Sequence, residues 1–268
     1  MNTPVKIAIH GAAGRMGRAL IQAASANSAV RLAAAVDRAG AAELGQDAGA
    51  LAGLTPNGVM LGAELKLAGV DVLLDFTRPE ATLAGLDACV GAGKAMVIGT
   101  TGFNQAQRSR LEAAAGKIPL CLSGNFSIGI NLCMQLVEQA ARALGDKFDI
   151  EIIEAHHRAK VDAPSGTALM LGEAAAHGVG RDLKDVALYD RHGHTGARES
   201  RSIGFSTIRG GDVVGDHTVL FLGDGERLEI THRASSRMNF ANGAVRAAAW
   251  LAGRKPGLYS MHDVLAQP

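Results

Sequence analysis

The stretch VKIAIHGAAGRMGR, residues 5–18, decides the fold of the first half of the chain. Val5–Ile9 is a short apolar strand that runs into the glycine turn Gly11–Gly17 and then into a helix, which we place at about Arg18–Ser25. A glycine turn in this context indicates a dinucleotide site, because such a site needs a tight turn, close backbone approach to pyrophosphate and close helix–strand packing. The commoner fingerprint has glycine where Ala13 stands, so the pattern alone is a weak signal.

The end of the next expected strand, residues 31–36, supports the dinucleotide site. Asp37 follows this strand and lies 20 residues after Gly17, which is the spacing at which an acidic residue holds the ribose hydroxyls. Arg38 can pair with a 2′-phosphate, since a guanidinium binds phosphate through two hydrogen bonds. Together the two residues predict a site for NADH and NADPH alike, and the alternative is an ordinary polar strand end.

Strands and helices alternate as far as residue 122. We expect further strands at 70–76, 95–98 and 118–122 and helices at 80–90 and 104–115. This alternation predicts an α/β fold with a Rossmann-type doubly wound parallel sheet, in which ligands bind beyond the carboxyl ends of the strands. The turns at those ends are 11–16, 77–79, 99–102 and 123–127. For 99–102 a plain connecting turn is the alternative, and residues 39–69 are too poorly periodic to place beyond helix, loop and a short strand.

The pattern changes at Ile128. Apolar residues recur there every four positions, at Ile128, Leu132, Leu136, Ala140 and Leu144, and predict one long amphipathic helix. Strands are expected at 186–189, 202–209, 218–222 and 227–232, the last two flanking the hairpin turn Gly223–Gly225. Strands without intervening helices predict a second, α+β domain with a mixed or antiparallel sheet. We therefore expect a first domain at 1–127, a second at 128–237, and a segment 238–268, with a helix at 240–251, that packs back on the first.

Composition excludes several classes of protein. Lys and Arg number 27 and Asp and Glu 26, so the formal charge of +1 indicates neither a nucleic-acid nor a membrane-surface partner. Cys89, Cys121 and Cys133 form no CxxC pair and lie in apolar runs, which suits buried thiols rather than disulfides or zinc ligands. His192 and His194 lack a third ligand at a useful spacing, so no metal is expected. A strand-like N-terminus and the absence of a stretch of about 20 apolar residues predict a cytoplasmic protein.

The chemistry is placed at EAHHRAKVDAPSGT, residues 154–167. The β-branched run 149–155 before it predicts a strand, and the run 167–176 after it predicts a helix with Ser165 as N-cap. The free N–H groups at a helix N-terminus favour an anion. A carboxylate on Gly166 and Thr167 would lie within reach of the loop's lysine and histidine. The alternative is a solvated loop whose charges have no function.

These residues resemble the 4-hydroxy-tetrahydrodipicolinate reductase family, long called dihydrodipicolinate reductase, of the diaminopimelate route to lysine. The resemblance runs nearly from end to end and is most specific at 154–168. The motifs that carry it are GAAGRMGR (11–18), DFTRPE (75–80), GTTGF (99–103), NFSIGIN (125–131), EAHHRAKVDAPSGTA (154–168), GDVVGDHT (211–218) and SSRMNFANGAVRAA (235–248).

The resemblance implies a role for each matching position. His156 would be the proton donor or acceptor and Lys160 the proton donor. The substrate would be bound by His157, Gly166 and Thr167. The residues that would hold the pyrophosphate are Gly11, Ala12, Ala13, Gly14, Arg15 and Met16. The adenosine ribose and its 2′-phosphate would be held by Asp37 and Arg38. The nicotinamide end would be lined by Gly99, Thr100, Thr101, Ser123, Gly124, Asn125 and Phe126.

Family members often carry Glu at the position of Asp37, so the preference between NADH and NADPH stays open. The resemblance also implies a homotetramer joined through the sheet of the second domain. As a hypothesis, hydride attacks C4 of a cyclic imine dicarboxylate that loses water, and a histidine or lysine supplies the proton that the ring nitrogen needs.

Two other functions compete with this hypothesis. Another two-domain nicotinamide enzyme, such as a semialdehyde or amino-acid dehydrogenase, is the first; one that acts through cysteine would present a thiol in a polar setting. A regulator that senses NAD(P)H without turnover is the second, and it would have no use for His156 and Lys160 beside an anion-binding turn.

Overall fold

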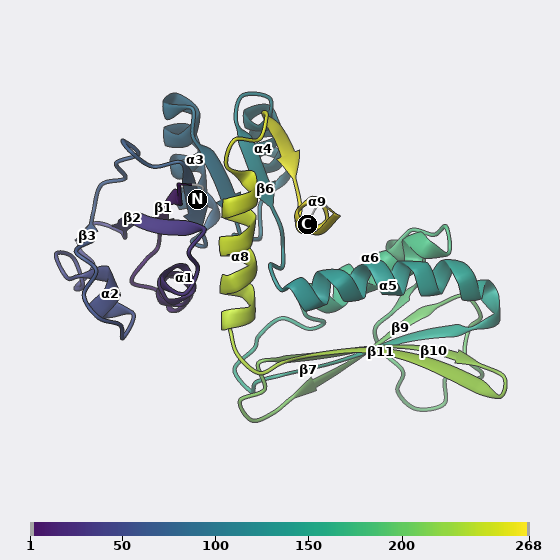
Figure 1. Cartoon of the computed structure of the whole chain (residues 1–268). Helices are drawn as coiled ribbons and strands as arrows, with labels where there is room; N and C mark the ends of the chain where they lie inside the picture. The colour runs from purple at the N-terminus through teal and green to yellow at the C-terminus, as the bar shows by residue number, and fades with distance from the viewer. Residues whose placement is uncertain (1–2, 267–268) are drawn as a thin grey trace. The chain divides into compact units, whose positions relative to one another are not determined.

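The computed structural model describes residues 3–266 and divides into two compact units. Unit 1 contains the chain as far as Ile128 and again from Arg237 onward, and unit 2 is the continuous segment Gly129–Ser236. Each unit has its own sheet and its own hydrophobic core (Figure 1). The sequence had predicted limits near 127 and 237.

Unit 1 is built on a seven-stranded sheet in the order β12-β6-β5-β4-β1-β2-β3. All neighbouring strands are parallel, so their carboxyl ends lie at one edge of the sheet. The strands are β1 (Val5–His10), β2 (Val30–Val36), β3 (Leu61–Gly62), β4 (Val72–Asp75), β5 (Ala95–Ile98), β6 (Pro119–Leu122) and β12 (Gly257–Tyr259). Strands β4 and β5 are buried along their whole length, which is why they read as unbroken apolar runs.

Helices cover both faces of this sheet, as the doubly wound prediction requires (Figure 1). Helices α1 (Arg15–Ser25) and α8 (Met238–Leu251) share one core cluster, whose residues include Leu20, Val97 and Val245. Helices α3 (Pro79–Ala92) and α4 (Gln105–Ala115) pack on the opposite face. The short helix α9 (Met261–Ala266) adds to the α8 side.

The region that could not be placed from sequence, 39–69, contains little regular structure. It holds only the four-residue helix α2 (Ala48–Leu51) and the two-residue strand β3. The Asp47 carboxylate accepts hydrogen bonds from the backbone N–H groups of Ala50, Asn57 and Gly58. The Asp47 side chain therefore holds this loop together, and hydrophobic periodicity in the sequence does not predict such a loop.

Unit 2 contains a five-stranded sheet in the order β11-β10-β7-β9-β8. Strands β7, β9 and β8 are parallel, whereas β10 runs antiparallel to both β7 and β11, which confirms the predicted mixed sheet. The strands are β7 (Asp149–His156), β8 (Ala187–Leu188), β9 (Ile203–Arg209), β10 (Gly215–Gly223) and β11 (Glu226–Ala234). The hairpin at Asp224 and Gly225 is confirmed by the pairing of Gly223 with Glu226. The strand expected at 186–189 is wrong in part, because the short helix α7 (Leu183–Val186) occupies its start.

Helices α5 (Ile128–Leu144) and α6 (Gly166–Gly178) cover one face of this second sheet (Figure 1), and η1 (Gly145–Lys147) follows α5. The long α5 helix was predicted correctly, but its apolar stripe was not. Leu132 and Leu136 are 50% and 43% exposed, whereas Ile130 and Val137 are buried. Four residues turn a helix by 400°, so a stripe at every fourth position drifts away from the core by about 40° per step. Within residues 3–266, no helix combines the length and apolar character needed to cross a membrane.

Candidate functional site

The glycine turn of unit 1 is shaped by close backbone packing. Gly11 has a φ of +76°, and a Cβ on Gly17 would lie 2.2 Å from the Gly11 carbonyl oxygen. Only glycine therefore fits at position 17, where helix α1 crosses the turn at van der Waals distance. Helix α1 begins at Arg15, so the predicted start near Arg18 was three residues late. Arg15 and Met16 form its first turn, and Ala12 is buried.

Two side chains hold the turn in place. The Ala13 N–H donates to Asp37 Oδ2 at 2.9 Å, and Arg18 Nε donates to the Ala13 carbonyl at 2.9 Å. Arg18 also pairs with Glu43 at 3.3 Å. Arg18 was not among the residues predicted from the sequence. Its place at the end of the GAAGRMGR motif and its positive charge could have indicated a contact with the turn. Arg38 is exposed and makes no ion pair with any residue of 3–266.

The turn opens into a cavity of about 720 Å³ within unit 1. A cavity of this size suits a small-molecule ligand or cofactor. Five of the predicted cofactor residues line it, namely Gly11, Ala13, Gly14, Asp37 and Arg38. Its other lining residues include His10, Glu43, Phe76, Thr77 and Arg78.

The remaining predicted cofactor residues follow β5 and β6, at the carboxyl edge of the same sheet. Gly99, Thr100 and Thr101 follow β5, and Ser123, Gly124, Asn125 and Phe126 follow β6. Thr100 and Phe126 are buried, and the Phe126 ring packs on that of Phe76 with centroids 5.3 Å apart. A Cβ on Gly99 would lie 2.0 Å from the same Phe76 ring, so this turn also depends on glycine. The side chains of Thr100 and Phe126 thus support the turns that carry their neighbours.

A buried carboxylate, Asp75, ties these turns together. Its oxygens accept hydrogen bonds from Thr82 (2.7 Å), Thr100 (3.0 Å) and Thr77 (2.8 Å), and His10 Nδ1 lies 2.6 Å away. Burial opposes ionisation, but these hydrogen bonds outweigh it and hold the pKa of Asp75 below its usual range. The contact of His10 with Asp75 could not be predicted from the sequence, since the two residues lie on different strands and meet only through the β1–β4 register.

In unit 2 the predicted strand, loop and helix are all present. The Ser165 side chain accepts the Ala168 N–H and so caps α6. Gly166, at the first turn of α6, is exposed, which leaves the positive end of the helix open. Lys160 Nζ lies 2.9 Å from Asp162 Oδ2 on the loop.

His156 lies at the end of β7 on the face that the helices cover. Its Nδ1 is 2.6 Å from Oε2 of Glu154, a buried carboxylate two residues earlier on the strand. Burial lowers the pKa of His156 below 6.5, although Glu154 acts in the opposite direction. His157, the residue that follows β7, is half-buried.

The link between Glu154 and Ser165 joins the two ends of this segment. The Ser165 N–H donates to Glu154 Oε1 at 3.0 Å, so the end of β7 and the start of α6 are held together. The structure therefore brings His156, Lys160 and the open helix end into one segment of unit 2. It places the predicted cofactor residues together at one edge of unit 1.

Other parts of the described chain lack comparable chemistry. Two further cavities, of about 500 and 630 Å³, are lined by parts of 169–189 and 199–202 and contain none of the predicted residues. Burial raises the pKa of Cys89 and Cys121 to about 12, so neither thiol is a nucleophile near neutral pH. Within residues 3–266, no three His, Cys, Asp or Glu side chains are grouped as a metal site would need.

Comparison with known families matches both halves of the chain. A family model described as "Dihydrodipicolinate reductase, N-terminus" matches residues 5–126, and one described as "Dihydrodipicolinate reductase, C-terminus" matches residues 129–265. Together the two models account for nearly the whole chain.

Individual proteins agree with this match. A 4-hydroxy-tetrahydrodipicolinate reductase from Alkalilimnicola ehrlichii is 61% identical over 97% of this chain and 98% of its own length. One from Thiobacillus denitrificans is 58% identical over the same shares. A dipicolinate-bound dihydrodipicolinate reductase from Paenisporosarcina sp. TG-14 is 25% identical with a TM-score of 0.74, over 96% of this chain and 97% of its own.

Proposed function

Because the chain belongs to the dihydrodipicolinate reductase family, we propose that it reduces 4-hydroxy-tetrahydrodipicolinate to tetrahydrodipicolinate, with loss of water and oxidation of NADH or NADPH. The reaction lies in the diaminopimelate route to lysine. The observation that carries this function is the β7–α6 segment, which holds a histidine, a lysine and an open helix end in a chain of this family. Burial of Cys89 and Cys121 disfavours either thiol as the nucleophile of a cysteine-dependent dehydrogenase.

The cofactor would be held at the carboxyl edge of the unit 1 sheet. Backbone N–H groups of the glycine turn and of the first turn of α1 suit a pyrophosphate, since glycine at 11 and 17 leaves no Cβ in the way. Asp37 suits the ribose. The exposed Arg38, which pairs with no acidic residue of 3–266, suits a 2′-phosphate. The turns 99–101 and 123–126 would line the nicotinamide end, and the bound cofactor supplies the hydride.

The substrate would be held by the open end of α6. A dicarboxylate can accept hydrogen bonds from the N–H groups of Gly166 and Thr167 and pair with Lys160. His157, half-buried beside them, would complete the contacts. Support comes from the Paenisporosarcina relative, which binds dipicolinate, a planar ring with two carboxylates.

Lys160 and His156 would carry out the proton transfers. The Lys160 ammonium is fixed by Asp162, so it can donate a proton to the ring nitrogen as hydride arrives at C4. With its pKa below 6.5, His156 is mainly neutral at pH 7.5 before substrate binds. A dicarboxylate beside its ring would raise that pKa and let His156 donate as well as accept.

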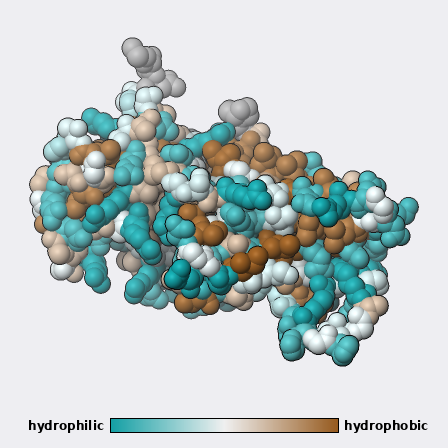
Figure 2. Space-filling view, turned by 90° about the horizontal axis from the view of Figure 1, so that it is seen from below, coloured by the Kyte–Doolittle hydropathy of each residue, from teal (hydrophilic) through white to brown (hydrophobic). Residues whose placement is uncertain are grey.

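A homotetramer would use the open face of the unit 2 sheet, which α5 and α6 leave uncovered. Strand alternation places Ile153, Ile208 and Leu220 on that face, and Ile208 is 53% exposed. Seen from below, unit 2 shows apolar residues gathered among polar ones (Figure 2). Exposed apolar surface of this kind is typical of subunit interfaces. The need for reduced nicotinamide favours a cytoplasmic location.

The test is a coupled assay that makes fresh substrate from aspartate semialdehyde and pyruvate and follows the loss of reduced-cofactor absorbance. The intact chain should consume NADPH or NADH, and His156→Ala and Lys160→Ala should each lose about 10²- to 10⁴-fold in kcat. A regulator that only senses the cofactor would bind it without consuming it. Near-native turnover in both variants would refute the assigned roles.

A further inference from the structure

The Glu154 carboxylate is the centre of a buried hydrogen-bond network. It is 1% exposed, and Arg209 donates to both of its oxygens, Nη1 to Oε2 at 2.7 Å and Nη2 to Oε1 at 2.8 Å. The Ser165 N–H donates to Oε1 at 3.0 Å, and His156 Nδ1 lies 2.6 Å from Oε2. Burial alone would raise the pKa of Glu154, but these hydrogen bonds lower it to about 2. The group is therefore a carboxylate throughout the neutral range.

An ionised carboxylate decides which nitrogen of His156 carries the proton. Glu154 can only accept, so in the neutral ring Nδ1 must be the N–H nitrogen and Nε2 must hold the lone pair. Nε2 lies 3.0 Å from the point where a Cβ on Gly215 would be, so that glycine leaves room for the reactive side of the ring. Proton exchange with the substrate is thereby assigned to Nε2.

Arg209 reaches the second proton carrier as well. Its Nη2 donates to the Asp162 backbone carbonyl at 2.6 Å, and the Asp162 side chain holds Lys160 Nζ at 2.9 Å. A single guanidinium on β9 thus fixes the strand histidine through Glu154 and the loop lysine through Asp162. The planar fork of arginine can satisfy three acceptors at once, which a lysine amine cannot do with the same geometry.

We propose that Glu154 and Arg209 are positioning residues for the reaction assigned above: Glu154 sets the tautomer and charge of His156, and Arg209 aligns His156 with Lys160. The inference rests on the proposed function, in which His156 and Lys160 carry the protons. The charged and titratable groups that face His156 are Glu154 from its own strand, Lys160 from the loop, Arg209 from β9 and His217 from β10.

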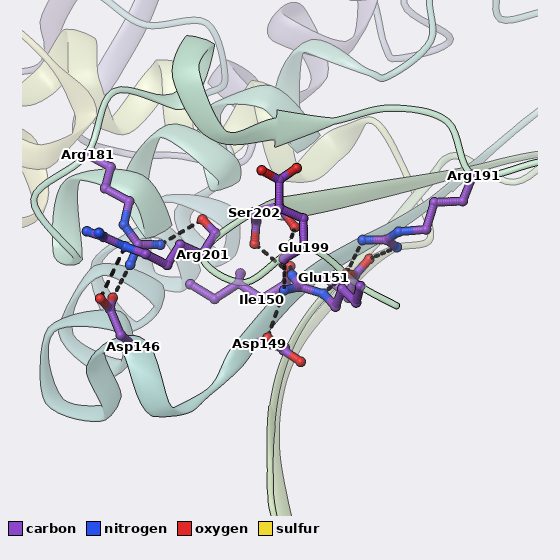
Figure 3. Close-up of polar contacts among 10 residues, drawn as sticks. Asp146, Asp149, Ile150, Glu151, Arg181, Arg191, Glu199, Arg201 and Ser202 are labelled. Atoms are coloured by element: carbon purple, nitrogen blue, oxygen red, sulfur yellow. Dashed lines mark hydrogen bonds and ion pairs between the residues drawn. The ribbon is translucent and has the colours of Figure 1, made fainter. Parts of the chain in front are cut away.

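The same strand carries a matched control. Glu151 is also bound by arginines, with Arg191 donating to both of its oxygens and Arg198 Nε to Oε1 at 2.9 Å (Figure 3). No histidine is among these partners. Glu151 faces the open side of the sheet and Glu154 the helix-covered side, as strand alternation requires. Glu151→Gln therefore removes a comparable carboxylate from the same strand without touching His156.

The first experiment measures kcat/KM from pH 5.5 to 9.5 for the wild type, Glu154→Gln, Arg209→Lys and Glu151→Gln. Light scattering checks that all four have the same oligomeric state. Glu154→Gln should lose between about 10-fold and 10⁴-fold in kcat with a smaller change in KM, because only the proton transfers are misaligned. Its pH profile should also move to lower pH, since removing the negative charge lowers the pKa of His156. Glu151→Gln should leave the profile in place, and a shift equal to that of Glu154→Gln would refute the proposal.

Arg209→Lys keeps the positive charge but loses the planar guanidinium. It should therefore still lower kcat, because the charge alone does not align His156 with Lys160. A double-mutant cycle then asks whether Glu154 acts through His156. Adding Glu154→Gln to His156→Ala should cost less than threefold beyond His156→Ala alone, because the residue that Glu154 aligns is already gone. Full additivity of the two losses would show that Glu154 has a separate structural effect and would overturn the inference.

A readout independent of turnover separates this inference from the proposed function. Nitrogen-15 NMR of histidine-labelled protein reports which ring nitrogen of His156 is protonated, with His156→Ala used to assign the signals. The wild type should show protonated Nδ1 and unprotonated Nε2 at pH 8, and Glu154→Gln should lower the pH at which the ring titrates. An Nε2–H tautomer in the wild type would refute the positioning role, even if the chain is fully active as a reductase.

Discussion

Replacing His217 with glutamine should remove about 3 kcal/mol of the change in unfolding free energy between pH 6.5 and 4. His217 is buried on β10, its Nε2 lies 3.0 Å from Ser165 Oγ, and its ring makes an edge contact with His156 at 5.1 Å. Burial first, and the neighbouring His156 second, lower the pKa of His217 to about 4. In the imidazolium both ring nitrogens carry a proton, and Nδ1 has no hydrogen-bond partner among the described residues.

The sign and size of the effect follow from linkage. The unfolded chain takes up a proton at its histidine near pH 6.5, whereas the folded chain resists until about pH 4. The unfolded state therefore binds more protons in this window, and the free energy of unfolding falls as the pH falls. At 1.36 kcal/mol for each pH unit, the difference between 6.5 and about 4 amounts to about 3 kcal/mol.

Urea unfolding followed by far-UV circular dichroism at pH 7, 6, 5 and 4 measures this contribution. His217→Gln should be less stable than the wild type at pH 7, since it loses native packing, and the gap should close by about 3 kcal/mol toward pH 4. His192→Gln, which removes an exposed histidine of the same unit, is the control and should parallel the wild type. If His217→Gln also ran parallel to the wild type across the window, His217 would not be a buried neutral histidine.

Three other substitutions test separate parts of the molecule. Gly17→Ala places a Cβ 2.2 Å from the Gly11 carbonyl oxygen, so fluorescence titration should show weakened NADH and NADPH binding alike, and thermal unfolding a loss of about 1–3 kcal/mol. Arg38→Ala should raise KM for NADPH far more than KM for NADH, and equal increases would argue against a 2′-phosphate contact. Thr82→Val removes a 2.7 Å hydrogen bond to the buried Asp75 carboxylate and should cost about 1.5–3 kcal/mol in urea unfolding, with Thr→Val at an exposed threonine as the reference.

Much of the architecture could be predicted because it depends on local patterns. Strand β5 was placed at its observed limits, since a short apolar run between a helix and a glycine turn has few other structures available. The hairpin around Asp224 and the N-cap at Ser165 were equally local, and both are present. The apolar stripe of α5 was assigned wrongly because several of its faces carry apolar residues, and only the packing partner decides between them.

In the candidate site, too, contacts between residues close in sequence could be predicted, whereas contacts between distant segments could not. His156 and Lys160 could be predicted as a pair because they are close in sequence. The contact of Glu154 with His156 could have been predicted too, since residues i and i+2 of a strand share a face. Arg209 and His217 come from strands more than 50 residues later and reach His156 only through strand register. The Asp75 cluster was invisible for the same reason, because His10, Thr82 and Thr100 approach it from three separate segments.

The insertion of unit 2 into unit 1 has a consequence for synthesis on the ribosome. Unit 2 is one uninterrupted segment that ends at Ser236, so all of it has been translated while the remainder of unit 1 is still being made. The large core of unit 1 must wait, because α8 supplies Ala244, Val245 and Leu251 to it. The nascent chain therefore passes through a stage in which unit 2 can already be folded, although its synthesis begins later. Unit 1 still exposes an incomplete apolar face at that stage.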